Sequence, residues 1–173
     1  MKFSFVLSVL GLISSSLAAP AKVMANDEFW LLVISTNATL NGRYVQPRFQ
    51  DEGVYYAHAW PHDQSPEKTF TLSRGFLSCN DVVNGENLGV EIGKHTEPTG
   101  YDVMNIDRGG WQPGFSFTDN FLYLDGSENW YLCFVDNPIG TKDPTVVRWT
   151  DGDVPEECFS VKLQKTPVYT IQE

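Results

Sequence analysis

Short runs of β-forming residues, broken by turn residues, fill almost the whole chain from Phe29 onwards. Each run has the length of one strand, and no segment repeats apolar residues at helical spacing for three turns. The 14 Gly and 10 Pro residues are scattered as turn residues between the runs. This pattern predicts an all-β fold, a single compact antiparallel β-barrel or sandwich, with a β-trefoil-like arrangement as one form of it. The expected strands are residues 29–34, 43–45, 53–57, 69–72, 76–79, 88–92, 101–106, 115–118, 121–124, 130–135, 145–149 and 159–163.

The first run, residues 29–34, has the sequence FWLLVI and contains no polar residue. A run without alternation of apolar and polar residues is typical of a strand that is buried on both faces. We therefore expect Trp30, which lies inside this run, to belong to the core.

One segment of the sequence is approximately repeated farther along the chain. Residues 70–77 (FTLSRGFL) resemble residues 115–122 (FSFTDNFL), at a shift of about 45 residues. In each copy a strand meets a two-residue turn, Arg74-Gly75 or Asp119-Asn120, and a second strand follows that begins with Phe-Leu. Three such hairpins would make a β-trefoil, but a third copy is not evident in the sequence.

Residues 1–18 are typical of a secretory signal peptide. Lys2 supplies a positive charge, an apolar run follows, and Ser16 and Ala18 are the small residues that a signal peptidase recognises. The apolar run is about eleven residues long, whereas a membrane-spanning helix needs about twenty. We expect cleavage after Ala18, which would leave residues 19–173 as a single secreted β-rich domain with one hydrophobic core.

The chain is strongly acidic, with 22 Asp and Glu residues against 12 Lys and Arg residues and a net charge of −10. Such a surface repels phosphate backbones and anionic lipid headgroups, which argues against nucleic acid and membrane partners. The simplest interpretation of the charge is solubility outside the cell, where we expect a monomer. Cell wall polysaccharide and other extracellular proteins remain as partners.

Three cysteines, Cys79, Cys133 and Cys158, would enter an oxidising compartment, where two of them normally form a disulfide. Cys133 and Cys158 are the preferred pair, because both lie beside aromatic-rich strand-like runs near the C-terminus. Closing the loop between them would stabilise the fold by about 3.5 kcal/mol. Cys79 would then be a buried thiol or an intermolecular link, and its neighbours Phe76 and Leu77 favour burial. No Cys-x-x-Cys or Cys-x-x-His spacing occurs, so no zinc site is expected.

The histidines do not predict a metal site either. His58 and His62 lie four residues apart, a spacing that brings two imidazoles together only on a helix. Pro61, directly before His62, makes a helix doubtful there. We therefore expect a loop with two solvated histidines, and neither a metal nor a cofactor.

No group of residues forms a catalytic signature. Acidic residues such as Asp125, Glu128 and Asp136 could supply the carboxylate pair of a glycoside hydrolase, but the sequence gives no distance between them. Ser73 and Ser78 lack the Gly-x-Ser-x-Gly elbow of a serine hydrolase. The sequence therefore favours a protein without catalytic residues.

Tryptophans are the candidate ligand-binding residues. The chain has five Trp and seven Tyr residues, and flat aromatic rings stack on sugar faces while polar neighbours bind the hydroxyl groups. Trp60, Trp111, Trp130 and Trp149 lie beside turn residues, where a ring can stay partly exposed. Trp60, Trp111 and Trp130 are the three we expect to contact a saccharide. The alternative for each is a place in the core.

Asn37-Ala38-Thr39 is an acceptor sequence for N-glycosylation. It follows the first expected strand directly, where a turn would present Asn37 to solvent. In an exported protein we expect this asparagine to carry a glycan.

The order of several motifs resembles a known family. The motifs are the FWLLVI run, Phe70-Thr71-Leu72 with Phe76-Leu77, Gly114-Phe115-Ser116-Phe117, residues 121–126 (FLYLDG), Cys133, Trp149 and Cys158. Over residues 28–164 this order is similar to that of the small secreted cell wall proteins of filamentous fungi typified by the phialide-development protein PhiA. The resemblance implies a protein deposited in or shed from the fungal cell wall, with links to conidium formation and to allergen-like or effector-like behaviour. It implies no catalytic residues, and the chain departs from the family in lacking a cysteine close behind its signal peptide.

These observations together predict a secreted, cell-wall-associated fungal protein that is not an enzyme. It would contact wall polysaccharide or another secreted protein through exposed aromatic and acidic groups. Two alternatives remain, namely a host-directed effector or allergen-like protein, and a hydrolase of wall glycans.

Overall fold

The computed structural model describes residues 27–51, 54–61, 63, 66–81, 85–94, 101–136, 142–149 and 153–168. The expected signal peptide lies outside these residues. The described residues form strands, turns and loops and no helix, which confirms the all-β prediction, and none of them builds a helix that could cross a membrane. The strands are β1 (Phe29–Ile34), β2 (Tyr44–Asp51), β3 (Val54–Trp60), β4 (Thr69–Ser73), β5 (Phe76–Asp81), β6 (Glu86–Lys94), β7 (Tyr101–Asp107), β8 (Phe115–Thr118), β9 (Phe121–Leu124), β10 (Trp130–Asp136), β11 (Lys142–Trp149) and β12 (Cys158–Pro167).

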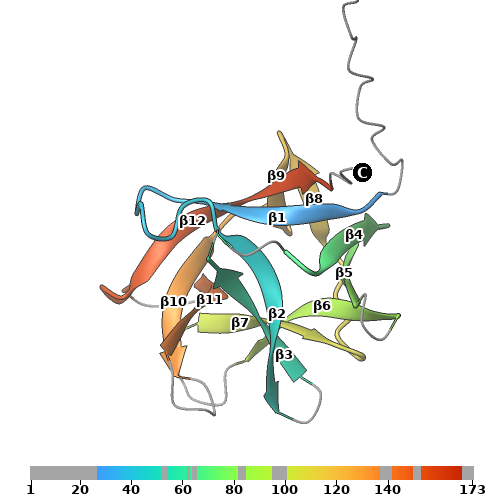
Figure 1. The fold of residues 1–173 in the computed structure, drawn as a ribbon, viewed down its shortest axis with the longest axis horizontal. Coiled ribbons are helices and arrows are strands. Elements are labelled where there is room, and N and C mark those ends of the chain that lie inside the picture. Colours follow the sequence, from blue (N-terminus) through green and yellow to red (C-terminus); the bar gives the residue numbers. More distant parts are fainter. Residues whose placement is uncertain are drawn as a thin grey trace, which may run out of the picture.

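All twelve strands belong to one antiparallel sheet that closes on itself. The sheet runs through β1, β4, β5, β6, β7, β3, β11, β10 and β12, and β12 pairs again with β1. Closure removes the free edges that an open sheet would expose to another chain. The prediction of a single antiparallel barrel or sandwich is therefore confirmed, and of these two forms the structure has the barrel (Figure 1).

The strand order has an approximate threefold repeat of four strands each, β1–β4, β5–β8 and β9–β12. The second and third strands of each unit form a hairpin, and the third strands β3, β7 and β11 pair with one another. Figure 1 shows these three hairpins together below β1. The remaining strands form the rest of the wall, through the pairs β1–β4, β4–β5, β8–β9, β9–β12 and β12–β1. This pairing is the trefoil-like form that the repeated hairpin suggested.

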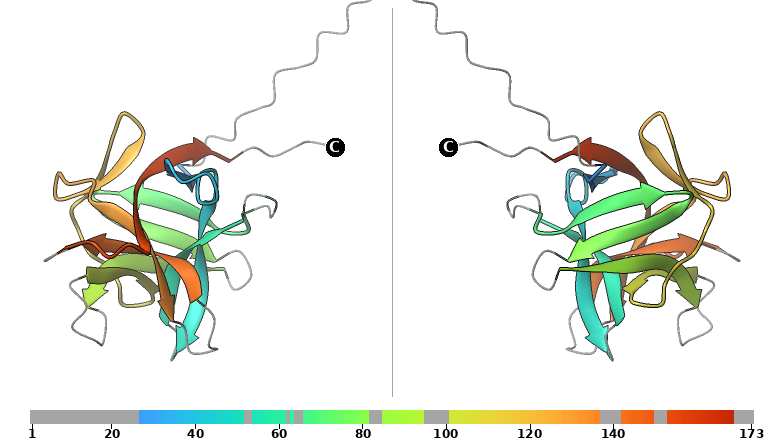
Figure 2. Two further views of the ribbon diagram at one scale, coloured as in Figure 1. Left: turned by 90° about the vertical axis from the view of Figure 1, so that its left-hand side faces the viewer. Right: turned by 90° about the vertical axis from the view of Figure 1, so that its right-hand side faces the viewer.

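The repeated segments are the β4–β5 and β8–β9 hairpins. Their turns need positive backbone φ angles, which are 52° at Arg74, 84° at Gly75, 51° at Asp119 and 67° at Asn120. The corresponding place in the third unit is taken by the pair of β12 with β1, in which Phe29 lies opposite Pro167. No turn joins these two strands because they are the last and first of the described strands, and so no third copy of the hairpin is found among them. Figure 2 shows the C-terminal strand in red beside the blue N-terminal part of the chain.

The first strand alternates in burial, contrary to the expectation from its sequence. Phe29, Leu31 and Val33 are almost fully buried, whereas the residues between them are only half-buried. Trp30 is one of the latter, and its ring packs edge-on against Tyr44 at 5.7 Å. The prediction of a strand buried on both faces is therefore wrong, because one face of β1 looks out of the barrel and is covered only by neighbouring side chains.

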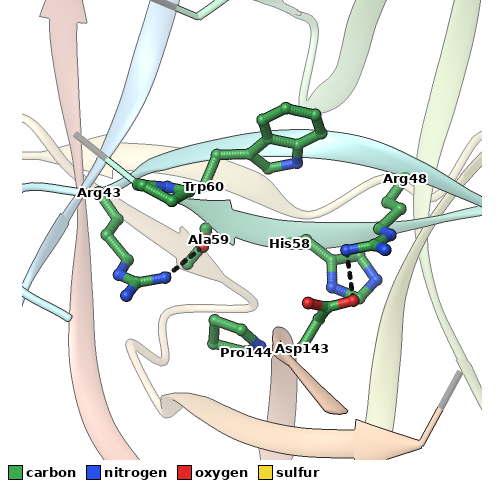
Figure 3. A pocket seen from close by; sticks show the side chains of 8 residues that line it. Arg43, Arg48, His58, Ala59, Trp60, Asp143 and Pro144 are labelled. Carbon is green, nitrogen blue, oxygen red and sulfur yellow. Dashed lines mark hydrogen bonds and ion pairs between the residues drawn. The ribbon is translucent and has the colours of Figure 1, made fainter. Parts of the chain in front are cut away.

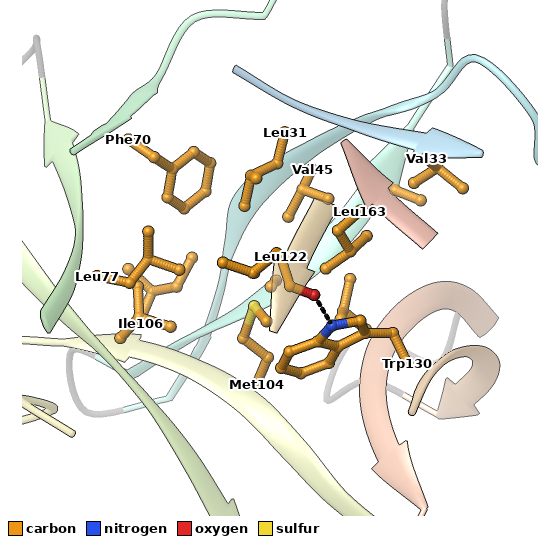
Figure 4. Packing of buried hydrophobic residues seen from close by; sticks show 14 of the residues in the cluster. Leu31, Val33, Val45, Phe70, Leu77, Met104, Ile106, Leu122, Trp130 and Leu163 are labelled. Carbon is orange, nitrogen blue, oxygen red and sulfur yellow. Dashed lines mark hydrogen bonds between the residues drawn. The ribbon is translucent and has the colours of Figure 1, made fainter. Parts of the chain in front are cut away.

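The barrel interior is filled by aliphatic and aromatic side chains from all three units (Figure 4). Trp130 is the largest of them, 1% exposed, and its indole Nε1 donates a hydrogen bond of 2.7 Å to the carbonyl oxygen of Leu122. Cys79 is buried in the same core and lies outside the disulfide. Its predicted burial is confirmed.

A second, smaller core lies on the outer face of the hairpins. Val103, Cys133 and Val147 are its buried members, and aromatic side chains such as Tyr101 and Trp149 pack around them. Cys133 lies opposite Cys158 in the register of β10 and β12, and the two form a disulfide. The predicted pairing is therefore confirmed.

Candidate functional site

A pocket of about 240 Å³ opens between β2, β3 and the start of β11. Figure 3 shows Arg43 on one side of it, Arg48 and His58 on the other, Trp60 above and Asp143 and Pro144 below. Its lining residues are Arg43, Arg48, His58, Ala59, Trp60, Pro61, Asp143 and Pro144.

The register of the strands brings these side chains together. On the face of β3 that looks away from the barrel core, His58 and Trp60 follow each other at the two-residue spacing of a strand. Gln46 of β2 lies opposite His58, so Arg48, two residues farther along β2, falls on the same face. Thr145 of β11 also lies opposite His58, which places Asp143 beside Arg48.

Arg43 is fixed at the entrance of the pocket by two backbone carbonyl groups. Its Nε donates to the oxygen of Thr39 at 2.7 Å, and its Nη1 donates to the oxygen of Ala59 at 3.2 Å. These bonds hold the turn that follows β1 against β3. Within the described part of the chain no carboxylate pairs with this guanidinium group, so its charge is not neutralised locally.

Arg48 and Asp143 form an ion pair on the opposite side of the pocket. Their side chains are 31% and 22% exposed, so the pair is reached by solvent but is partly desolvated. A pair in such a position is stronger than one on an open surface, because less water screens it. Together with Arg43, the pocket carries two guanidinium groups and one carboxylate.

His58 forms the floor of the pocket. It is 2% exposed, and its Nδ1 lies 3.3 Å from the hydroxyl group of Thr145. Burial lowers the pKa of His58 to about 4, with Asp143 opposing and Arg48 assisting the change. The predicted solvated loop is wrong for His58, because this residue belongs to β3 and is covered by β11. His62, the other histidine of that prediction, lies outside the described residues.

The buried imidazole should make stability depend on pH. Below a pH of about 6.5 the unfolded chain takes up a proton at His58, whereas the folded protein does so only near pH 4. Keeping His58 neutral therefore does not lower the free energy of unfolding above a pH of about 6.5. The free energy of unfolding decreases as the pH falls from about 6.5 to about 4. Between pH 7.5 and 4.5 we expect the wild type to lose about 2 kcal/mol more unfolding free energy than His58→Asn, measured by urea denaturation. Equal losses in the two proteins would show that His58 is not held neutral.

Gln46 holds the chain segment that follows Trp60. Its amide group is almost fully buried, and its Nε2 donates to the oxygens of Val45 and Lys68 at 2.8 and 3.0 Å. Its Oε1 accepts from the backbone N–H groups of Glu67 and Lys68 at 3.1 and 2.8 Å. The amide thereby ties this segment to β2, close to one wall of the pocket.

The structure separates the three tryptophans that were expected to contact a saccharide. Trp60 is half-buried and lines the pocket. Trp111 is 47% exposed and lies on the loop after β7, where its Nε1 donates to the oxygen of Arg108 at 3.2 Å, and it does not line the pocket. Gly89 permits this loop to lie close, since a Cβ there would come within 3.0 Å of the Trp111 ring. The prediction that Trp130 contacts a saccharide is wrong, because its ring is buried in the core.

Asn37 lies in the turn that Arg43 holds in place. Its side-chain oxygen accepts hydrogen bonds from the N–H group and the hydroxyl group of Thr39 at 3.0 and 2.8 Å. The asparagine is half-buried and its neighbours Ala38 and Thr39 are exposed. Glycosylation of Asn37 stays a prediction.

The chemistry that the pocket offers is recognition by charge and ring stacking. Among the described residues that line the pocket, Asp143 is the single carboxylate and is paired with Arg48, so these residues do not form the two opposed carboxylates of a glycoside hydrolase. Among the described residues, no three His, Cys, Asp or Glu side chains form a group that could hold a metal ion.

Comparison with known proteins gives a family. Residues 26–167 match the model of a family described as Domain of unknown function (DUF7907). This range contains every residue that lines the pocket. No curated protein and no solved structure matches the chain.

Proposed function

The chain belongs to the DUF7907 family of domains of unknown function, and we propose that it is a non-enzymatic, secreted protein of the fungal cell wall that binds saccharide. The observation that carries this proposal is the pocket in which the ring of Trp60 lies opposite polar and charged side chains. Sugar sites combine one aromatic face with a few fixed hydrogen-bonding groups. Arg43 would supply such groups beside the ring, and the Arg48–Asp143 ion pair lines the opposite side of the pocket.

Two further observations support the location that we propose. The disulfide between Cys133 and Cys158 fits an oxidising compartment outside the cytosol, in agreement with the signal peptide expected in residues 1–18. The order of motifs resembles that of fungal cell wall proteins, and a link to conidium formation is part of the same proposal.

The proposal is tested by depletion of the purified protein from solution with insoluble chitin, β-1,3-glucan, cellulose and calcium pectate. We expect at least one polymer to retain the wild type and to shift its tryptophan emission. Trp60→Ala should weaken retention about tenfold, because stacking of one ring on a sugar is worth about 1.4 kcal/mol. The measurement is the bound fraction as a function of polymer concentration.

Trp111→Ala is the matched control, since it also removes one indole from the surface but lies outside the pocket. Retention should be unchanged in this variant. No retention of the wild type by any polymer would contradict the proposal and would favour an effector that binds a host protein. Equal loss in both variants would remove the pocket as the site.

A further inference from the structure

We propose that the pocket recognises an acidic sugar, with the carboxylate of one uronate residue held by Arg43 while the sugar ring lies against Trp60. This inference rests on the proposed saccharide binding and names the class of ligand. A neutral sugar would use the ring of Trp60 equally well, so the assignment depends on the charges that surround the ring.

The pocket is positive within an acidic protein. Two guanidinium groups and one carboxylate line it, and His58 adds no charge near neutral pH because burial keeps its pKa at about 4. One positive charge therefore remains in the pocket of a chain with a net charge of −10. An anion therefore gains more electrostatic interaction energy in this pocket than on the acidic surface around it.

The geometry of Arg43 identifies the group that would bind the anion. Its Nε and Nη1 are used by the backbone oxygens of Thr39 and Ala59, which fix the plane of the guanidinium group. The Nη2 group forms no bond within the described residues and carries the donors that remain. A donor that is already oriented loses little conformational entropy when a ligand carboxylate accepts from it.

The second arginine already holds a carboxylate in the same pocket. Asp143 forms an ion pair with Arg48. This pair shows that a carboxylate can bind a guanidinium group within the pocket. Asp143 therefore acts as an internal competitor for the ligand's acid group, and it restricts the available cation to Arg43. Removal of its charge would free Arg48 and make the pocket more attractive to an anion.

The size of the pocket fits a single sugar residue. Its volume of about 240 Å³ is just below the usual range of small-molecule sites, about 300–1,000 Å³. The acidic surface outside the pocket repels a long polyanion, although this repulsion is screened beyond about 8 Å at physiological salt. The best ligand is therefore a monomeric uronate or the uronate at the end of a short oligomer.

The test measures the affinity of soluble sugars from the quenching of tryptophan emission and from titration calorimetry at pH 7. The probes are D-galacturonate and D-glucuronate, with D-galactose and D-glucose as neutral partners and sodium acetate as a bare carboxylate. We expect the wild type to bind at least one uronate about tenfold more tightly than its neutral partner and than acetate. Arg43→Gln should abolish this difference.

Asp143→Asn gives the decisive variant, because it is expected to raise uronate affinity about fivefold while the neutral sugar is unaffected. A misfolded variant cannot gain affinity. Glu128→Gln is the matched control, since it also removes one ion-paired carboxylate, that of Glu128 with Lys162 at 3.0 Å, but outside the pocket. It changes the net charge by the same amount and should leave uronate affinity unchanged.

Several outcomes would overturn the inference. Weaker uronate binding by Asp143→Asn would mean that Asp143 binds sugar hydroxyl groups directly. Equal binding of neutral and acidic sugars would refute the acidic ligand while saccharide binding itself remained. Acetate as tight as a uronate would indicate a general carboxylate site. Failure of every sugar, together with failure of the polymers, would refute the proposed function as well. Retention of the protein by calcium pectate without binding of either soluble uronate would overturn the single-residue site.

Discussion

Replacement of Trp130 by alanine is expected to lower the free energy of unfolding by about 4 kcal/mol. The indole is the largest fully buried side chain among the described residues, and it belongs to a core whose members come from all three units of the barrel. Its removal would leave a cavity that rigid strands cannot close, and would also leave the carbonyl oxygen of Leu122 without its 2.7 Å hydrogen bond. Urea denaturation followed by circular dichroism measures the loss.

Two further variants separate the contribution of the buried volume of Trp130 from that of its hydrogen bond to Leu122. Trp130→Phe keeps most of the buried volume and loses the N–H group, so we expect it to cost about 1–2 kcal/mol. Trp111→Ala removes an indole from an exposed loop and should cost less than about 0.5 kcal/mol. A loss in Trp130→Ala no larger than that in Trp111→Ala would contradict the position of Trp130 in the core.

Replacement of both Cys133 and Cys158 by alanine is expected to cost about 3.5 kcal/mol. The disulfide joins two paired strands at a sequence separation of 25 residues, and the unfolded chain without it gains the entropy of that open loop. The sulfur atoms also pack beside Val103 and Val147 in the smaller core, so a part of the loss is a packing loss. The measurement is the urea midpoint of the oxidised wild type against that of the double variant.

The reduced wild type is the internal control for this experiment, because it keeps both sulfur atoms and lacks the link. Cys79→Ala tests the other cysteine, which is buried and lies outside the disulfide. It should cost only the packing of one small side chain, and reductant should destabilise it as much as it destabilises the wild type, because the Cys133–Cys158 disulfide is retained. A double variant as stable as the oxidised wild type would show that the disulfide does not contribute to stability.

The strands themselves could be predicted from the sequence because each run carried its own signal. Short lengths, β-branched and aromatic residues, and intervening turn residues are local properties. The turns Arg74-Gly75 and Asp119-Asn120 were recognisable for the same reason. The pairing of Cys133 with Cys158 could be predicted because both lie beside aromatic-rich strand-like runs near the C-terminus.

The closure of the barrel could not be predicted in this way. It depends on pairs that are distant in sequence, such as Phe29 with Pro167, and no local pattern encodes them. The burial of Trp130 could have been predicted from the sequence. Trp130, Leu132 and Phe134 follow the two-residue period of a strand with an apolar inner face. The neighbouring turn residue Asn129 suggested exposure, but the pleat of the strand decides the direction of the side chain.

Only Trp60 of the pocket was predicted as a ligand contact. Arg43, Arg48 and Asp143 come from three separate segments, and their spacing in the sequence carries no information about a shared site. The register of β2, β3 and β11 brings them together, and register is set by the whole sheet. His58 was misassigned for the same reason, because the strand that covers it begins more than eighty residues later in the chain.

The first and last described strands, β1 and β12, pair with each other and so close the ring of three units. Because Phe29 and Pro167 lie opposite each other in β1 and β12, a short linker that replaces the residues before Phe29 and after Pro167 could form the turn that the third unit lacks. The Arg74-Gly75 and Asp119-Asn120 turns are then equivalent places at which a circularly permuted chain could begin and end. The observed order of the units is therefore one of three connectivities that the same barrel can accommodate.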